Sequence, residues 1–324
     1  VVFGAYVRLS DAGLGCPDWP GCYGHVTPAQ AAAAEAGTIA APLHVGKAWR
    51  EMIHRYGAST LGLVILVIAG LAWRWRRQPG MPLGLPLSLV GLVIFQGLLG
   101  MWTVTLLLKP LIVTLHLIFG LTTLSLLWWL WLSLRRRSTS PWSGSVSALG
   151  GGSAAAMLLP AAVAVRRVAL IALLALAVQI ILGGWTSTNY AAVACPDFPT
   201  CQASWWPDAN YRDAFVLWRG LGINYEGGVL DHPARVAIHF THRLGAVVAT
   251  LALLFAAITS LGDRPGKNRR WAAIAVLAAL ALQLTIGISM VKLGFPLWLA
   301  TAHNAGAALL LLSTLALNRA LRRA

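Results

Sequence analysis

The feature that most constrains the fold is a series of seven apolar segments, each near the length of a membrane span. They run roughly over residues 51–73, 83–105, 111–134, 167–188, 236–261, 271–291 and 296–317. A helix needs about 20 apolar residues to cross a bilayer. Only 11% of the residues are charged, against roughly 25% in soluble domains. The sequence therefore predicts an all-α polytopic membrane protein, in which residues 1–9 form the outer end of a truncated first helix, making eight.

The basic residues predict how the chain is oriented. The net charge of +15 would favour nucleic acid in a soluble protein, but here Lys and Arg cluster at the ends of apolar segments. Such clusters mark cytoplasmic loops. The main clusters are Arg74, Arg76 and Arg77; Arg135 to Arg137; Arg166 and Arg167; and Arg264, Lys267, Arg269 and Arg270. We therefore expect a membrane protein with both termini in the cytoplasm and loops 10–50 and 189–235 outside, and we exclude nucleic acid as a partner.

An internal repeat predicts two related halves. GAYVRLSDAGLGCPDWPGC at 4–22 aligns without a gap with GGWTSTNYAAVACPDFPTC at 183–201. EMIHRYGA and HFTHRLGA also correspond, as do two Thr-x-His motifs further along. A duplicated unit of four helices accounts for these matches. We predict two pseudo-symmetric four-helix bundles, residues 1–137 and 166–324, joined by a Ser/Gly/Ala-rich cytoplasmic linker at 138–165.

Four histidines are the strongest candidates for cofactor binding. All lie within about two turns of the outward end of a span, at repeat-equivalent positions: His54, His116, His242 and His303. A pair of neutral imidazoles from two helices can bind a haem iron axially, and the helices supply apolar walls for the macrocycle. The pattern therefore predicts two bis-histidine iron sites, one in each half.

Charged residues beside the histidines suggest further roles. Arg55 and Arg243 each follow a histidine and are predicted to pair with haem propionates, although snorkelling to lipid headgroups is an alternative. Glu51 is the only acidic residue inside any span. A helical di-iron site would need further carboxylates, so that kind of site is excluded. Glu51 remains a functional carboxylate or a hydrogen-bonding group that supports a ligand.

Four cysteines form two pairs in the outer loops, where oxidation is permitted. Their short spacing favours the disulfides Cys16–Cys22 and Cys195–Cys201. A structural role is favoured for the second pair, and a redox role for the first stays open.

Together, RLSDAGLGCPDWPGC, EMIHRYGA, TLHLIFG, HFTHRLGA and TAHNAGA resemble the heme A synthases, membrane enzymes of cytochrome oxidase biogenesis. The resemblance implies oxidation of the C8 methyl of heme O to a formyl group. It implies that His242 and His303 bind a heme b cofactor, that His54 and His116 flank the substrate haem, and that Glu51 is the catalytic carboxylate. Heme O is the implied substrate, with heme O synthase and a quinone or other electron acceptor as candidate partners.

Two other functions compete with this one. A b-type electron-transfer cytochrome would hold two bis-histidine haems and make no product, but it gives no reason for a carboxylate in one half only. A thiol oxidant that feeds quinone through its cysteine pairs would leave the four histidines without a role. The difference between Glu51 and its repeat counterpart, His239, favours the enzyme.

The orientation can be tested with reporter fusions after Ala40 and after Asp208. Both positions lie in loops that the positive-inside rule places outside. We expect activity only from a reporter that functions after export. Activity of a cytoplasmic reporter at either position would contradict the orientation.

Overall fold

The computed structural model describes residues 1–35, 44–135, 152–262 and 265–322, and these residues form an almost entirely helical protein. The elements are α1 (Val2–Leu9), α2 (Pro28–Glu35), α3 (Val45–Arg74), α4 (Gly84–Thr105), α5 (Pro110–Arg135), α6 (Gly152–Thr188), the 3₁₀ turn η1 (Ala192–Ala194), α7 (Tyr211–Ala214), α8 (His232–Ser260), α9 (Lys267–Lys292) and α10 (Leu297–Leu321). In these ranges, extended pairing is limited to the isolated bridges Cys22–His25 and Cys201–Ser204.

Seven of the described helices are long and apolar enough to cross a membrane, namely α3 to α6 and α8 to α10. This confirms the predicted polytopic membrane protein, since each predicted span falls on one of these helices. The expected partial helix at residues 1–9 is α1. The helix is the natural form for these segments because lipid offers no partner for an unpaired backbone amide or carbonyl.

The predicted linker at 138–165 overlaps the start of a helix. Residues 136–151 lie outside the described residues, but the chain is helical from Gly152 onward, so α6 begins earlier than the apolar pattern predicted. The sequence Gly-Ser-Ala-Ala-Ala contains good helix formers after its first residue, which explains how helix can extend beyond the most apolar stretch.

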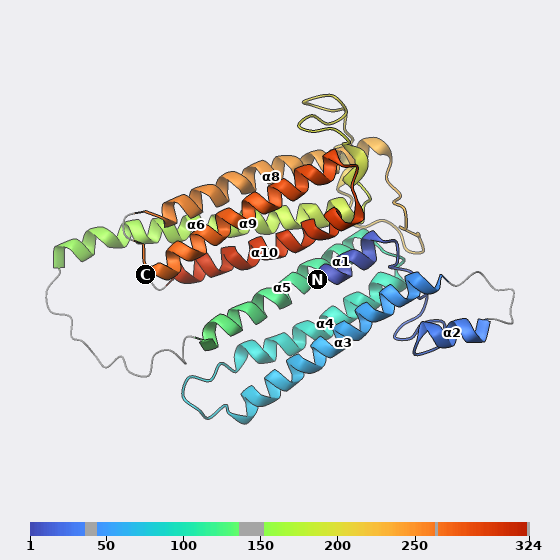
Figure 1. Ribbon diagram of the computed structural model, residues 1–324, viewed down its shortest axis with the longest axis horizontal. Coiled ribbons are helices and arrows are strands. Elements are labelled where there is room, and N and C mark those ends of the chain that lie inside the picture. The colour runs from blue at the N-terminus through green and yellow to red at the C-terminus, as the bar shows by residue number, and fades with distance from the viewer. Residues whose placement is uncertain (36–43, 136–151, 263–264, 323–324) are drawn as a thin grey trace.

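The helices form two groups that lie side by side (Figure 1). One group contains α1, α3, α4 and α5, and the other contains α6, α8, α9 and α10. The groups meet where α1 and α5 pack against α10 and where α5 packs against α6. Thr114 of α5 and Thr188 of α6 share a buried hydrogen bond of 3.1 Å at this boundary.

Small side chains allow close packing in the second group. Its buried cluster includes Ala169 and Ala172 of α6, Ala256 and Ala257 of α8, and Ala273 of α9. Helices in lipid gain little from burying apolar surface against one another, so they associate through such close van der Waals contact. Large apolar side chains such as Leu63, Ile171 and Leu251 remain exposed and are suited to contact lipid.

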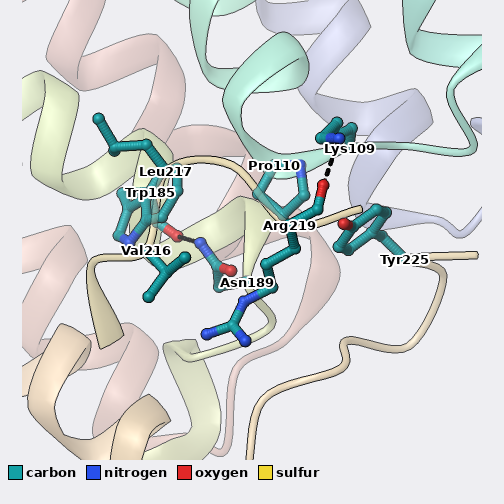
Figure 2. A pocket seen from close by; sticks show the side chains of 8 residues that line it. All are labelled: Lys109, Pro110, Trp185, Asn189, Val216, Leu217, Arg219 and Tyr225. Atoms are coloured by element: carbon teal, nitrogen blue, oxygen red, sulfur yellow. Dashed lines mark hydrogen bonds between the residues drawn. The ribbon is translucent and has the colours of Figure 1, made fainter. Parts of the chain in front are cut away.

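A buried lysine fastens the outer loop between α7 and α8 to the first group (Figure 2). Lys109, between α4 and α5, is only 1% exposed. Its ammonium donates to the carbonyl oxygens of Arg219 at 2.5 Å and Gly220 at 3.0 Å. It also lies 3.3 Å from the centre of the Trp218 ring. A loop that belongs to the second half of the sequence is thereby tied to the first half.

Replacement of Lys109 by Met should loosen this loop. Hydrogen bonds to charged groups contribute about 1.5–3 kcal/mol each, so their loss should increase local opening by about tenfold or more. We expect trypsin to cleave the purified variant after Arg219 correspondingly faster, as measured by mass spectrometry of the fragments. Lys292→Met, at an exposed lysine of α9, is the matched control and should cleave like the unmodified protein. Equal cleavage rates in both variants would contradict the role of Lys109.

Candidate functional site

The structure brings together the first pair of histidines identified in the sequence. His54 of α3 and His116 of α5 have ring centroids 6.5 Å apart, and the ring planes are nearly perpendicular at 86°. In the other group, His242 lies on α8 and His303 lies on α10. All four rings are half-buried.

The spacing of the first pair suits a shared iron. Metal–imidazole bonds of about 2 Å on both sides of one ion would put the two ring centres roughly 6 Å apart. The separation of 6.5 Å is close to this value. The donors also fit chemically, because two neutral imidazoles are a common axial pair for haem iron.

Each of the four imidazoles rests against a glycine of a neighbouring helix. A Cβ atom at any of these glycines would come within 2.9–3.4 Å of the Cε1 atom of the ring. The pairs are Gly4 with His54, Gly100 with His116, Gly183 with His242, and Gly287 with His303. The missing side chain therefore leaves the space that each ring occupies.

Three glutamines contact the histidines. The side-chain amide of Gln96 donates to the backbone carbonyl of His116 at 2.8 Å. Gln179 lies 3.1 Å from Nδ1 of His242, and Gln283 lies 3.3 Å from Nδ1 of His303. The sequence patterns described above gave none of the three a role. A polar amide inside an apolar span was the signal that could have identified all three.

Glu51 is buried at the outer end of α3, with 4% of its surface exposed. Its Oε2 atom accepts a hydrogen bond from the backbone N–H of Cys16 at 2.9 Å. Its Oε1 atom forms an ion pair with Arg55 at 2.5 Å. The carboxylate is thus held between the first outer loop and a residue one turn along its own helix.

Arg55 also binds the loop directly. Its guanidinium donates to the carbonyl oxygens of Asp18 at 2.9 Å and Gly21 at 2.5 Å. A planar guanidinium carries five N–H groups, so it can hold several carbonyls and a carboxylate together. The residue that follows His54 therefore fixes the disulfide-bearing loop above the first histidine pair.

The second half repeats these contacts, with His239 in the place of Glu51. Nδ1 of His239 accepts the N–H of Cys195 at 3.3 Å, in the place that Glu51 takes in the first half. Arg243 donates to the carbonyl oxygens of Cys195 at 2.8 Å and Thr200 at 2.6 Å. Both arginines therefore contact loop carbonyls, and their predicted contact with haem propionates stays a prediction.

The two cysteine-bearing loops are each closed by a disulfide and by an aspartate. The structure joins Cys16 to Cys22 and Cys195 to Cys201, each with Cα atoms 4.7 Å apart. Asp197 accepts hydrogen bonds from the Thr200 side chain and from backbone N–H groups, which hold its pKa below the ordinary value. Asp18 likewise accepts from the N–H groups of Tyr23 and Gly24. The motif Cys-Pro-Asp-aromatic-Pro-x-Cys is thus a self-closing turn.

Comparison with known proteins shows which family the chain belongs to. The family model COX15-CtaA, described as a cytochrome oxidase assembly protein, matches residues 1–315. A heme A synthase of Shewanella oneidensis is 42% identical over 98% of this chain and 91% of its own length. Heme A synthases of Rhizorhabdus wittichii and Halalkalibacterium halodurans are 28% and 27% identical, over 97% and 93% of this chain and 88% and 85% of their own lengths. The chain therefore belongs to the COX15-CtaA family of cytochrome oxidase assembly proteins.

Proposed function

We propose that the chain is a heme A synthase, a membrane oxidoreductase that converts the C8 methyl group of heme O to a formyl group and so makes heme A for cytochrome oxidase. Its similarity to heme A synthases along nearly its whole length supports this activity. The observation that carries the proposal is the buried carboxylate of Glu51, three residues before His54 and without an acidic counterpart in the other half. A cytochrome that only transferred electrons would not require this difference between halves.

We further infer that the membrane part comprises eight spans in two pseudo-symmetric bundles. The halves are residues 1–137 and 166–324, with the linker at 138–165 between them. The recurrence of the same contacts supports this division, since each half has an arginine on its disulfide loop and glycines behind its histidines.

The two histidine pairs have different proposed roles. His54 and His116 flank the substrate haem, whereas His242 and His303 hold a resident heme b. The glutamine amides beside both rings of the second half support a permanent cofactor there. When bound, the haem iron supplies the electron-transfer chemistry.

The protein residues position the reactants and move protons. Oxidation of the methyl group to a formyl group takes its oxygen atom from water and releases protons as well as electrons to the acceptor. Glu51 can accept or relay a proton because each carboxylate oxygen has more than one lone pair. Arg55 holds Glu51 in a fixed direction through the ion pair. Arg55 and Arg243 also remain candidates for binding haem propionates near the outer surface.

The location and partners follow from the same proposal. We place the chain in the bacterial cytoplasmic membrane, with both termini in the cytoplasm and the disulfide loops outside. Heme O is the substrate, heme O synthase is its proposed supplier, and a quinone or another acceptor takes the electrons. The basic residues near the predicted inner ends of the spans support this orientation.

Replacement of His242 or His303 by Ala should remove the tightly bound heme b. Loss of one axial ligand opens the iron coordination and leaves space in the apolar site. Absorption spectra of the purified variants, normalised to protein, measure the loss. Retention of an unchanged low-spin spectrum by both variants would contradict the assignment of heme b to the second half.

Replacement of Glu51 by Gln tests the catalytic proposal most directly. Gln keeps the volume and can still accept the Cys16 N–H, but it cannot take up a proton at neutral pH. We expect formyl product to fall by about 100-fold or more, as for other lost acid–base groups, while heme b content stays near normal. The measurement is the ratio of heme A to heme O and hydroxylated intermediate in extracted haem.

Glu51→Ala provides the comparison, because it also removes the contact with the Cys16 N–H. If Glu51 only anchors the loop, the Gln variant should make normal amounts of heme A while the Ala variant does not. If the unmodified protein, supplied with heme O, makes no heme A, the electron-transfer cytochrome becomes the better explanation.

A further inference from the structure

Gln96 and Gln283 occupy corresponding positions in the two halves but make different contacts. Gln96 of α4 donates to the backbone carbonyl of His116 and leaves the ring alone. Gln283 of α9 lies 3.3 Å from Nδ1 and 3.2 Å from Nε2 of the His303 ring. The same residue type therefore supports a helix in one half and contacts a proposed iron ligand in the other.

Buried polar atoms without hydrogen-bonding partners indicate which further hydrogen bonds each glutamine could form. Over the described ranges, the Oε1 atoms of Gln283, Gln96 and Gln179 are all buried without a hydrogen-bonding partner. Nδ1 of His116 is also buried without a partner in that part of the chain. An unpaired buried acceptor or donor destabilises the folded protein, so each atom needs an explanation.

Iron binding by His303 would give the unpaired Oε1 atom of Gln283 a hydrogen-bonding partner. A histidine that binds iron through Nε2 keeps its proton on Nδ1, and this N–H requires an acceptor. The oxygen and nitrogen of a glutamine amide exchange places by a half turn about the last side-chain bond. After that turn, Oε1 of Gln283 lies where Nε2 now lies, within reach of Nδ1 of His303.

We propose that Gln283 is a positioning residue, which accepts the Nδ1–H of His303 and so sets the orientation and basicity of this axial ligand. The inference rests on the proposed heme b site of the second half and adds a residue to it. The packing allows little freedom, because Gly287 lies behind the His303 ring and Gly306 lies against the Gln283 amide. In the first half, the side-chain amide of Gln96 instead donates to the backbone carbonyl of His116.

The proposal predicts a change in the reduction potential of heme b. A hydrogen bond from Nδ1–H makes the imidazole a stronger donor and stabilises the ferric state, so Gln283→Leu should raise the potential. Removal of such supporting groups changes metal affinity by about 10-fold or more. A tenfold change in the ratio of ferric to ferrous affinity equals about 59 mV for a one-electron couple. Gln283→Glu, a stronger acceptor, should lower the potential.

The experiment is a spectroscopic redox titration of purified holoprotein in detergent. Gln96→Leu is the matched control, because Gln96 contacts only a backbone carbonyl in the other half, and its heme b potential should equal that of the unmodified protein. Equal potentials in Gln283→Leu and the unmodified protein, or equal shifts in Gln283→Leu and Gln96→Leu, would overturn the role of Gln283.

The variant His303→Ala distinguishes a failure of the proposal for Gln283 from a failure of the proposed heme b site. If His303→Ala loses heme b while Gln283→Leu keeps both the haem and the original potential, only the role of Gln283 is contradicted. If His303→Ala retains the original low-spin haem, the site assignment fails and the proposal for Gln283 fails with it.

Discussion

The rest of this structure depends on how the arginine that follows the first histidine of each half holds an outer loop. In lipid, the backbone N–H and C=O groups of a helix are hydrogen-bonded within the helix. Binding and catalysis must therefore come from side chains inside the bundle and from the loops at its ends. Arg55 and Arg243 bind loop carbonyls and thereby fix a disulfide-closed turn above each histidine pair. The ligand helix and its covering loop therefore form one connected unit in each half.

One residue difference within this unit distinguishes the two halves, because Glu51 of the first half corresponds to His239 of the second. Glu51 and His239 each accept the N–H of the first cysteine of a loop, so both serve the same structural purpose. Only the carboxylate forms an ion pair with its arginine. A duplicated scaffold can thus keep its loop attachment in both halves while one half acquires acid–base chemistry.

The sequence could predict the features that depend on composition and spacing. Helix length, apolar content and the repeated histidines are sufficient to predict the spans and the pairing of His54 with His116. It could not predict contacts that depend on how distant segments meet. Neither Lys109 under Trp218 nor Arg55 on the carbonyl of Gly21 has a local signature, because the partner is a backbone or ring far away in the chain. The helical start at Gly152 was missed because Gly and Ser near a helix end weaken the apolar pattern without preventing helix formation.

The four glycines behind the histidines have a consequence for the response of the protein to its membrane. A ring that rests on a long side chain can stay in place when two helices shift, because the side chain adjusts its rotamer. A ring that packs directly against a glycine contacts no side chain that can adjust in this way. It therefore has to move when the helix that carries the glycine moves. Helices tilt to match the thickness of the hydrocarbon layer. The geometry between paired imidazoles is therefore directly sensitive to the lipid chain length of the host membrane.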